Sequence, residues 1–205
     1  MSHLFAYLSR LKLIHRWGLM RSARVENVQE HTLQVAQIAH ALAVIQRVHF
    51  AGTVNPERVA TLALFHDAGE AITGDLPAPI KYFNPQIATA YKALEAVANE
   101  RLLAMVPPTL QETYRTLLVA EEEEEREHWA LVKAADKIAA YLKCVEELNA
   151  GNQEFAKAQA ALAESIAALA RPEVTYFMTT FVPSCSLSLD ELEHIAPTPG
   201  QGKLG

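Results

Sequence analysis

The sequence predicts an all-α protein built as a helical bundle. Apolar residues recur at intervals of three and four along most of the chain, which is the period of one face of an α-helix. Asparagine residues, one of them followed directly by proline, stand where such periodic stretches begin, as they do at the starts of helices. No stretch shows the alternation of apolar and polar residues that is typical of a half-buried strand.

Length and composition indicate a single domain. The chain has 205 residues, of which 50% are hydrophobic and 20% are charged, and a chain of this size can bury a substantial core. We expect one domain over residues 1–195. Residues 196–205 are rich in Pro and Gly and offer little to bury, so we expect them to form a flexible C-terminal tail.

The first two predicted helices each carry one apolar face. The face of the first helix, which ends near Trp17, consists of Phe5, Leu8 and Leu11. The second helix begins at Asn27, whose side chain can accept a hydrogen bond from a first-turn amide, and runs to about Val48. Its inward stripe consists of His31, Val35, Ile38, Leu42 and Ile45. His31 is therefore expected to face the core from the first turn.

A third helix is predicted to begin at Asn55, which precedes a proline at the first helical position. Its buried stripe consists of Val59, Leu62, Ala63 and His66. Gly69 and Gly74 weaken the end of this helix. Because each proline restricts both itself and the residue before it, we expect a rigid, extended loop over residues 75–79.

Four further helices complete the predicted bundle. Two of them cover residues 86–105 and 110–119, with two prolines between them. The acidic run 121–125 is interpreted as the solvated first turn of a long helix over about 122–148, because the helix dipole favours negative charge there. Another helix is expected over about 152–170. The final apolar patch consists of Tyr176, Phe177, Phe181 and Val182.

Charge and cysteine content indicate which binding partners and which cellular compartment to expect. The formal net charge of -6 leaves no broad basic surface, so we expect no polymeric nucleic acid as a partner. No apolar run approaches the ~18 residues of a membrane span, and the N-terminal segment lacks the apolar core of a signal peptide, so we expect no membrane association. Two cysteines without metal-site spacing fit a reducing compartment, and a cytoplasmic location is expected.

Four polar residues fall on inward positions of three predicted helices, where ionisable groups are out of place. They are His31, His66, Asp67 and Asp136. Histidine and aspartate together form a ligand set that suits a divalent transition metal. Each residue also has an ordinary alternative, because core histidines are commonly hydrogen-bonded and an aspartate near a helix end caps the helix or pairs with lysine. The convergence of all four favours a metal site.

Four segments of the chain resemble a known family. The pattern H…HD…D, formed by His31, His66-Asp67 and Asp136, is similar to the signature of the HD-domain phosphohydrolases, which are all-helical. The surrounding segments are SRLKLIHRW, VENVQEHTLQVA, FHDAGEAITGDLPAPIKYFN and LVKAADKIAAYLKCVEEL. In this order, and over a span from about residue 3 to residue 189, they resemble the bacterial 5′-deoxynucleotidases.

This resemblance implies an activity, a cofactor and a set of site residues. The family removes phosphate from deoxyribonucleoside 5′-monophosphates with one divalent ion per subunit, typically Co²⁺ or Mn²⁺, and its members are cytoplasmic homodimers. The implied metal ligands are His31, His66, Asp67 and Asp136, and the implied catalytic residues are Glu70 and Asp75. The implied substrate contacts are Arg16, Trp17, His31, Asp75, Leu76, Pro77 and Ala78.

Two positions depart from the family pattern. His15 stands where the family has Asn before Arg-Trp, and Ala78 stands where it has Thr. The second departure removes a hydroxyl that can bind substrate, although the backbone groups of the loop remain available.

Independently of the resemblance, charge and spacing suggest roles for residues near the expected metal site. The charge of a bound phosphate must be met, and Arg16 offers a planar fork for this while Lys81 offers a point charge. Glu70 lies one turn beyond His66, so its carboxylate shares that face and can take a proton from water. Asp75 can orient the water, protonate the leaving oxygen or bind the sugar 3′-hydroxyl, and the sequence does not separate these roles.

Other interpretations remain open from the sequence. Arg16 can be a surface residue at a helix end, Trp17 a packing residue and Glu70 a solvent-facing carboxylate. The chain can also be an HD-domain phosphohydrolase acting on another small nucleotide, or a catalytically dead helical scaffold that binds a nucleotide or a protein. We favour a phosphoric monoester hydrolase, because all four metal-binding positions and Glu70 are intact.

Overall fold

The all-α prediction is confirmed by a computed structural model, which describes residues 1–119 and 125–193. The α-helices are α1 (Leu4–Leu8), α2 (Val28–His49), α3 (Pro56–Phe65), α4 (Glu70–Thr73), α5 (Ala78–Lys81), α6 (Pro85–Leu103), α7 (Gln111–Leu118), α8 (Arg126–Asn149), α9 (Ala156–Ala167), α10 (Pro172–Thr180) and α11 (Leu189–Glu193). Short 3₁₀ helices are η1 (Leu11–Leu13), η2 (Pro108–Leu110), η3 (Gln153–Phe155) and η4 (Val182–Ser186). None of the helices described is long and apolar enough to cross a membrane.

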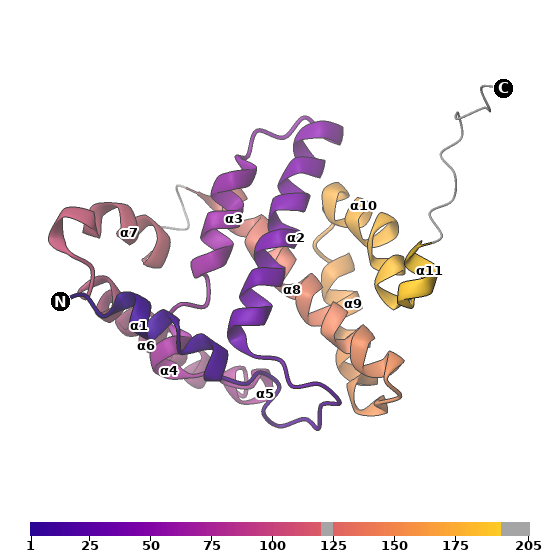
Figure 1. Ribbon diagram of the computed structural model, residues 1–205, viewed down its shortest axis with the longest axis horizontal. Helices are drawn as coiled ribbons and strands as arrows, with labels where there is room; N and C mark the ends of the chain where they lie inside the picture. The colour runs from indigo at the N-terminus through magenta and orange to yellow at the C-terminus, as the bar shows by residue number, and fades with distance from the viewer. Residues whose placement is uncertain (120–124, 194–205) are drawn as a thin grey trace.

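Helices α2, α3 and α8 form the centre of the bundle, with α9 and α10 on one side and α1, α4, α5 and α6 gathered at one end (Figure 1). The main buried cluster joins these three helices with α10 and includes Leu42, Leu62 and Ile138. A smaller cluster of α1, α6 and α7 contains Ala68, the residue after Asp67. The His66-Asp67 doublet therefore lies beside the boundary between two apolar clusters.

Three helix starts are fixed by asparagine side chains. The side-chain oxygens of Asn27, Asn55 and Asn84 accept hydrogen bonds from backbone amides three residues later, at the starts of α2, α3 and α6. Each bond satisfies an amide that has no partner inside its helix. The predicted starts at Asn27 and Asn55 are confirmed, and α2 ends at His49, one residue beyond the predicted end.

The predicted first helix is wrong in length, and its predicted face is wrong at Phe5. Helix α1 stops at Leu8 and buries Leu4, whereas Phe5 is 66% exposed; Leu11 of the predicted face is buried. Residues 14–16 leave the helical path and hydrogen-bond to the backbone of residues 26–28 instead. Pairing with a distant segment thus overrides the local helical periodicity.

Three other predicted boundaries change. The chain is extended only to Pro77, after which α5 begins with Pro79 in its first turn, where a proline costs no hydrogen bond. Residues 121–124 of the acidic run lie outside the described residues. Glu125 precedes α8 and pairs with Arg58 at 2.7 Å instead of joining the first turn. Helix α9 ends at Ala167 rather than near Ala170, where the backbone φ is 51°.

Candidate active site

The four predicted metal-binding residues come from three helices of the bundle centre. His31 lies in the first turn of α2, His66 caps the C-terminal end of α3 and is followed by Asp67, and Asp136 lies midway along α8. Helix α2 packs against both α3 and α8. This packing brings together side chains that are as many as 105 positions apart in the sequence.

Three of these residues form a compact cluster. His31, His66 and Asp67 each offer one ligand atom, and these atoms all lie within 4.8 Å of one another. Nε2 of His66 is 3.1 Å from Oδ2 of Asp67, and Nε2 of His31 is 3.8 Å from the same oxygen. Opposite ligands of an ion with bonds of 2.0–2.2 Å are roughly 4 Å apart, so the spacing is close to that of a metal site.

Asp136 adjoins this cluster through His31. Its Oδ1 lies 3.0 Å from Nε2 of His31, while its side chain is 45% exposed. The structure therefore brings all four predicted ligands to one place, although Asp136 lies outside the group of three whose ligand atoms meet within 4.8 Å.

The orientation of His66 suits a metal ligand. Its Nδ1 lies 2.7 Å from the carbonyl oxygen of Ala63, a contact in which Nδ1 donates the hydrogen bond. Such a bond fixes the ring orientation and, in the neutral imidazole, leaves the lone pair on Nε2. Among the residues described, the buried Nε2 has no hydrogen-bond partner of good geometry. An unpartnered nitrogen beside a carboxylate and a second imidazole fits a divalent cation.

Strong electrostatic coupling links the cluster. Burial alone would raise the pKa of Asp67, but His66, His31 and Arg16 hold it well below its usual range. Burial alone would lower the pKa of His66, but Asp67 and Asp136 raise it to about 9. Two carboxylates thus impose a local negative potential that attracts positive charge.

Glu70 is buried beside the cluster and does not face solvent. It is the first residue of α4 and is 9% exposed, and its Oε2 has no hydrogen-bond partner among the residues described. Burial, followed by the charges of Asp67 and Asp75, raises the pKa of Glu70 to about 9. A carboxyl group with a pKa near neutrality or above is suited to holding and transferring a proton.

A cavity of about 270 Å³ opens onto these residues from the side of α6 and α8. Its lining includes His66, Asp67, Glu70 and Asp136, together with residues that the sequence analysis did not select: Glu95, Asn99, Trp129 and Lys133. Gly69 leaves room for the Asn99 side chain, whose Oδ1 would lie 2.7 Å from a Cβ placed on Gly69.

Arg16 reaches the cluster from the N-terminal segment, and Trp17 follows it in the chain. The Arg16 side chain is 13% exposed, and its Nη1 lies 3.8 Å from Oδ2 of Asp67, so Arg16 is not a free surface residue. Trp17 packs against Phe155 with ring centroids 5.2 Å apart. Both side chains donate to Glu26, a buried carboxylate that the sequence analysis did not select.

The loop before α5 lies within electrostatic reach of the cluster. Asp75 is half-buried, and burial raises its pKa although Arg16, His31 and Lys81 act to lower it. Lys81 itself is neutralised, because its Nζ lies 2.8 Å from Oε1 of Glu95 and 4.5 Å from the centre of the Tyr91 ring.

Other residues of the predicted substrate loop differ in exposure. Leu76 and Pro77 are half-buried, whereas Ala78 is exposed as the first residue of α5. His15, the other departure from the family pattern, is exposed and forms an isolated bridge with Asn27.

Solved structures identify the class to which this fold belongs. The chain superposes on an HD-domain phosphohydrolase from Listeria innocua with a TM-score of 0.76 and 23% identity, covering 92% of this chain and 90% of the other. It also superposes on a cyanophage S-2L HD phosphohydrolase bound to dA and one catalytic Zn²⁺ ion, with a TM-score of 0.60, 18% identity and coverage of 87% and 96%. The protein has the HD-domain phosphohydrolase fold.

Sequence comparison gives the family within that class. A family model described as 5′-deoxynucleotidase YfbR-like matches residues 3–185. A 5′-deoxynucleotidase from Cronobacter sakazakii is 57% identical over 196 residues, which are 96% of this chain and 98% of that protein. One from Yersinia pestis is 58% identical over 192 residues, or 94% and 97% of the two chains. The chain belongs to the YfbR-like 5′-deoxynucleotidase family, as the sequence predicted.

Proposed function

We propose that this protein hydrolyses deoxyribonucleoside 5′-monophosphates to a deoxynucleoside and phosphate. The observation that carries the proposal is the meeting of His31, His66 and Asp67 within 4.8 Å, beside buried Glu70, in a chain that matches 5′-deoxynucleotidases over nearly its whole length. The family supports the enzyme class predicted from the sequence, a phosphoric monoester hydrolase.

We assign the metal site to His31, His66, Asp67 and Asp136. When bound, a divalent ion supplies a polarised water and neutralises phosphate charge. The two imidazoles provide neutral ligands and the two aspartates balance the charge of a dication. Co²⁺ and Mn²⁺ are the ions we propose, since imidazole and carboxylate ligands suit both.

The remaining residues are assigned to phosphate binding and proton transfer. Arg16 presents its Nη1 toward the cluster, where the guanidinium can bind phosphate oxygens. Glu70 acts as the general base in its deprotonated form, because it lies buried beside the cluster and a carboxylate whose pKa is raised takes a proton from water more readily. Asp75 binds the sugar or protonates the leaving 5′ oxygen, and residues 76–78 complete the substrate loop. We propose that Lys81 contributes less than Arg16 to phosphate binding, because Glu95 already balances its charge.

The cytoplasmic location, the homodimer and the absence of nucleic-acid and membrane partners are further parts of the proposal. They rest on the family resemblance and on the net charge of -6. Trp17, with one face on Phe155 and its indole nitrogen on Glu26, is assigned to shaping the sugar pocket rather than to stacking freely on a base.

A substrate panel tests the proposed function. Purified protein is stripped with a chelator, reloaded with Co²⁺, Mn²⁺, Zn²⁺ or Mg²⁺, and given deoxy and ribo 5′-monophosphates, triphosphates and cyclic diesters while phosphate release is measured. We expect metal-dependent release from the deoxy monophosphates and little from the others. Hydrolysis that continues undiminished after chelation, or a protein inactive with every metal and every monophosphate, would refute the proposal.

A further inference from the structure

One buried carboxylate oxygen, Oε2 of Glu26, binds the side chains of both Arg16 and Trp17. Glu26 is 9% exposed, and its Oε2 accepts hydrogen bonds from Nε of Arg16 and from Nε1 of Trp17, each at 3.0 Å. The backbone amide of Arg16 also donates to the carbonyl oxygen of Glu26 at 3.0 Å. A carboxylate is costly to bury unless its charge is compensated, and here one guanidinium and one indole compensate it.

The hydrogen bond to Glu26 determines which nitrogen of the Arg16 guanidinium remains available to a substrate. The guanidinium uses its Nε to bind Glu26, and its Nη1 then lies 3.8 Å from Oδ2 of Asp67. Although burial acts to lower the pKa of Arg16, Glu26 and then Asp67 raise it, so the side chain remains charged. A planar guanidinium held at Nε has a fixed orientation, and its Nη1 is directed toward the cluster.

The same oxygen holds Trp17 in an uncommon backbone conformation. Trp17 has a φ of 60°, in the left-handed region that bulky residues rarely adopt. Such a conformation is strained and persists only where surrounding contacts fix it. The contacts here are the hydrogen bond to Glu26 and packing against Phe155, which is fully buried.

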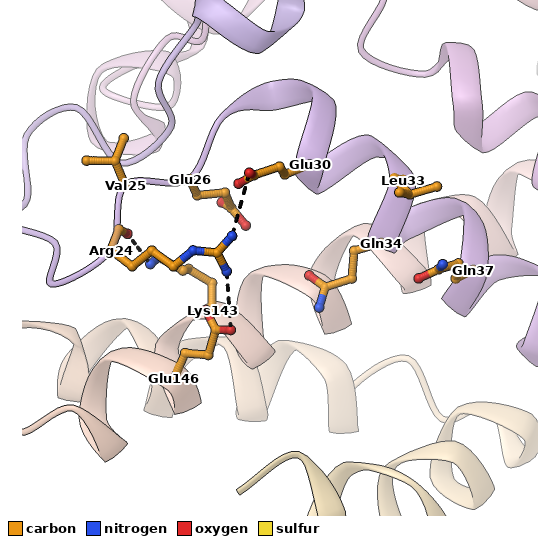
Figure 2. Close-up of a pocket in the computed structure, with 9 residues that line it drawn as sticks. All are labelled: Arg24, Val25, Glu26, Glu30, Leu33, Gln34, Gln37, Lys143 and Glu146. Carbon is orange, nitrogen blue, oxygen red and sulfur yellow. Dashed lines mark hydrogen bonds and ion pairs between the residues drawn. The ribbon is translucent and has the colours of Figure 1, made fainter. Parts of the chain in front are cut away.

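Helix α8 anchors the segment that carries Glu26. Glu147 accepts hydrogen bonds from the backbone amides of Ala23 and Arg24 at 2.7 and 3.2 Å, and Lys143 donates to the carbonyl oxygen of Arg24. Figure 2 shows Glu26 beside Arg24 and Lys143, on a second cavity of about 230 Å³. Glu26 is therefore supported from the bundle while its carboxylate acts on Arg16 and Trp17.

We infer that Glu26 is a positioning residue, which orients Arg16 toward the substrate phosphate and holds the Trp17 indole at the sugar pocket. The inference rests on the proposed function, because it concerns the same substrate. Within residues 1–119 and 125–193, the side-chain hydrogen bonds of Glu26 go to Arg16 and Trp17 and not to the metal-binding residues. It acts through the two side chains that it holds.

A double-mutant cycle tests this role. Glu26→Gln keeps the shape of the side chain and removes its charge, and we expect kcat/KM for a deoxyribonucleoside 5′-monophosphate to fall by about tenfold or more. Because Glu26 acts largely through Arg16, adding Glu26→Gln to Arg16→Ala should lower kcat/KM by less than about twofold. Glu146→Gln removes a carboxylate from the lining of the same second cavity, 3.9 Å from Arg24, and should leave kcat/KM unchanged.

A spectroscopic measurement accompanies the cycle. The chain has two tryptophans, so a ¹H–¹⁵N spectrum contains two indole Nε1–H signals, and Trp129→Phe assigns the Trp17 signal. That signal should shift in Glu26→Gln and stay in place in Glu146→Gln. If Glu26→Gln does not fold, as judged by circular dichroism, Glu26→Asp takes its place in both measurements, since it keeps the charge and shortens the reach.

The outcomes separate this inference from the proposed function. An inactive wild-type protein refutes the proposed function and the positioning role with it. An active wild-type protein whose kcat/KM is unaffected by Glu26→Gln, or independent losses that multiply in the double mutant, overturn only the role of Glu26. An unshifted Trp17 signal overturns the part of the inference that concerns the indole.

Discussion

At the scale of single residues, the site contains buried polar atoms without a hydrogen-bond partner of good geometry. Among those found in the described part of the chain are Nε2 of His66 and Oε2 of Glu70. Leaving a buried polar group unsatisfied costs about 1–3 kcal/mol, so such groups need a reason to persist. The proposed metal ion would account for the nitrogen, and a water held for the proposed proton transfer would account for the carboxyl oxygen. The site thus retains groups that lower the folding stability of the protein, because the chemistry requires them.

Glu70→Gln should lower the turnover rate while leaving the folding stability nearly unchanged. The amide has nearly the same shape, and it removes a carboxyl group whose pKa is already raised to about 9 by burial and by Asp67 and Asp75. We expect kcat to fall by about 10²-fold or more, as for removal of a general base. The free energy of unfolding in urea should stay within about 1 kcal/mol of the wild-type value.

Metal binding provides the control for Glu70→Gln. Isothermal titration with Mn²⁺ should give an affinity within about threefold of the wild-type value, whereas in Asp67→Ala the affinity should be lost, because Asp67, unlike Glu70, is assigned as a ligand. Wild-type turnover by Glu70→Gln would remove Glu70 from the role of general base.

At the scale of elements, a buried ion pair within α8 binds the backbone of the N-terminal segment. Glu147 and Lys143 are one helical turn apart, both almost fully buried, with Nζ and Oε1 separated by 2.5 Å. Burial acts to raise the pKa of Glu147, but hydrogen bonds from Lys143, Ala23, Asn152 and Arg24 lower it to about 2. The pair therefore stabilises the segment that carries Arg16, Trp17 and Glu26.

Glu147→Gln should destabilise the protein in a pH-dependent way. Breaking a buried ion pair by removing one charge costs about 3 kcal/mol, measured as the change in free energy of unfolding at pH 7. The folded pKa of Glu147 is depressed to about 2 from an ordinary 4.5, so its contribution is present above about pH 4.5 and is lost as the pH falls toward 2. The difference between wild type and variant should therefore shrink over that range.

Glu146→Gln is the matched control for Glu147→Gln. Glu146 is the preceding residue and its side chain is 56% exposed, so the substitution should change the free energy of unfolding by less than about 0.5 kcal/mol. An equal loss in the two variants, or a loss in Glu147→Gln that does not depend on pH, would contradict the role given to the buried pair.

At the scale of the whole molecule, metal binding should be coupled to folding, because the ligands come from three helices of the bundle centre. An ion that binds only the folded state at 100 times its dissociation constant adds about 2.7 kcal/mol to the free energy of unfolding. We expect Mn²⁺ or Co²⁺ to raise the melting temperature of chelator-treated protein. Asp67→Ala and Asp136→Ala should abolish this rise, whereas Asp190→Ala, at an exposed position in α11, should retain it. A rise of equal size in all three variants would place the ion elsewhere.

Much of the secondary structure could be predicted because its signals are local. Asn27 and Asn55 bind amides only three residues away, so the cap and the helix it starts lie in one short stretch of sequence. The same locality made the His66-Asp67 doublet visible as two polar groups in an apolar stretch. The predicted first helix was wrong because residues 14–16 pair with residues 26–28, a contact that no short window contains.

The sequence by itself determined the helices, the class of the fold and the types of side chain available to hold a cation. Only the tertiary structure decided that His31 lies 3.0 Å from Asp136, that Glu70 is buried, and that Lys81 is paired with Glu95. It also revealed Glu26, whose role depends on the left-handed turn at Trp17. The physical reason is range: capping and periodicity act within a few residues, whereas burial and charge compensation depend on every helix that packs around a group.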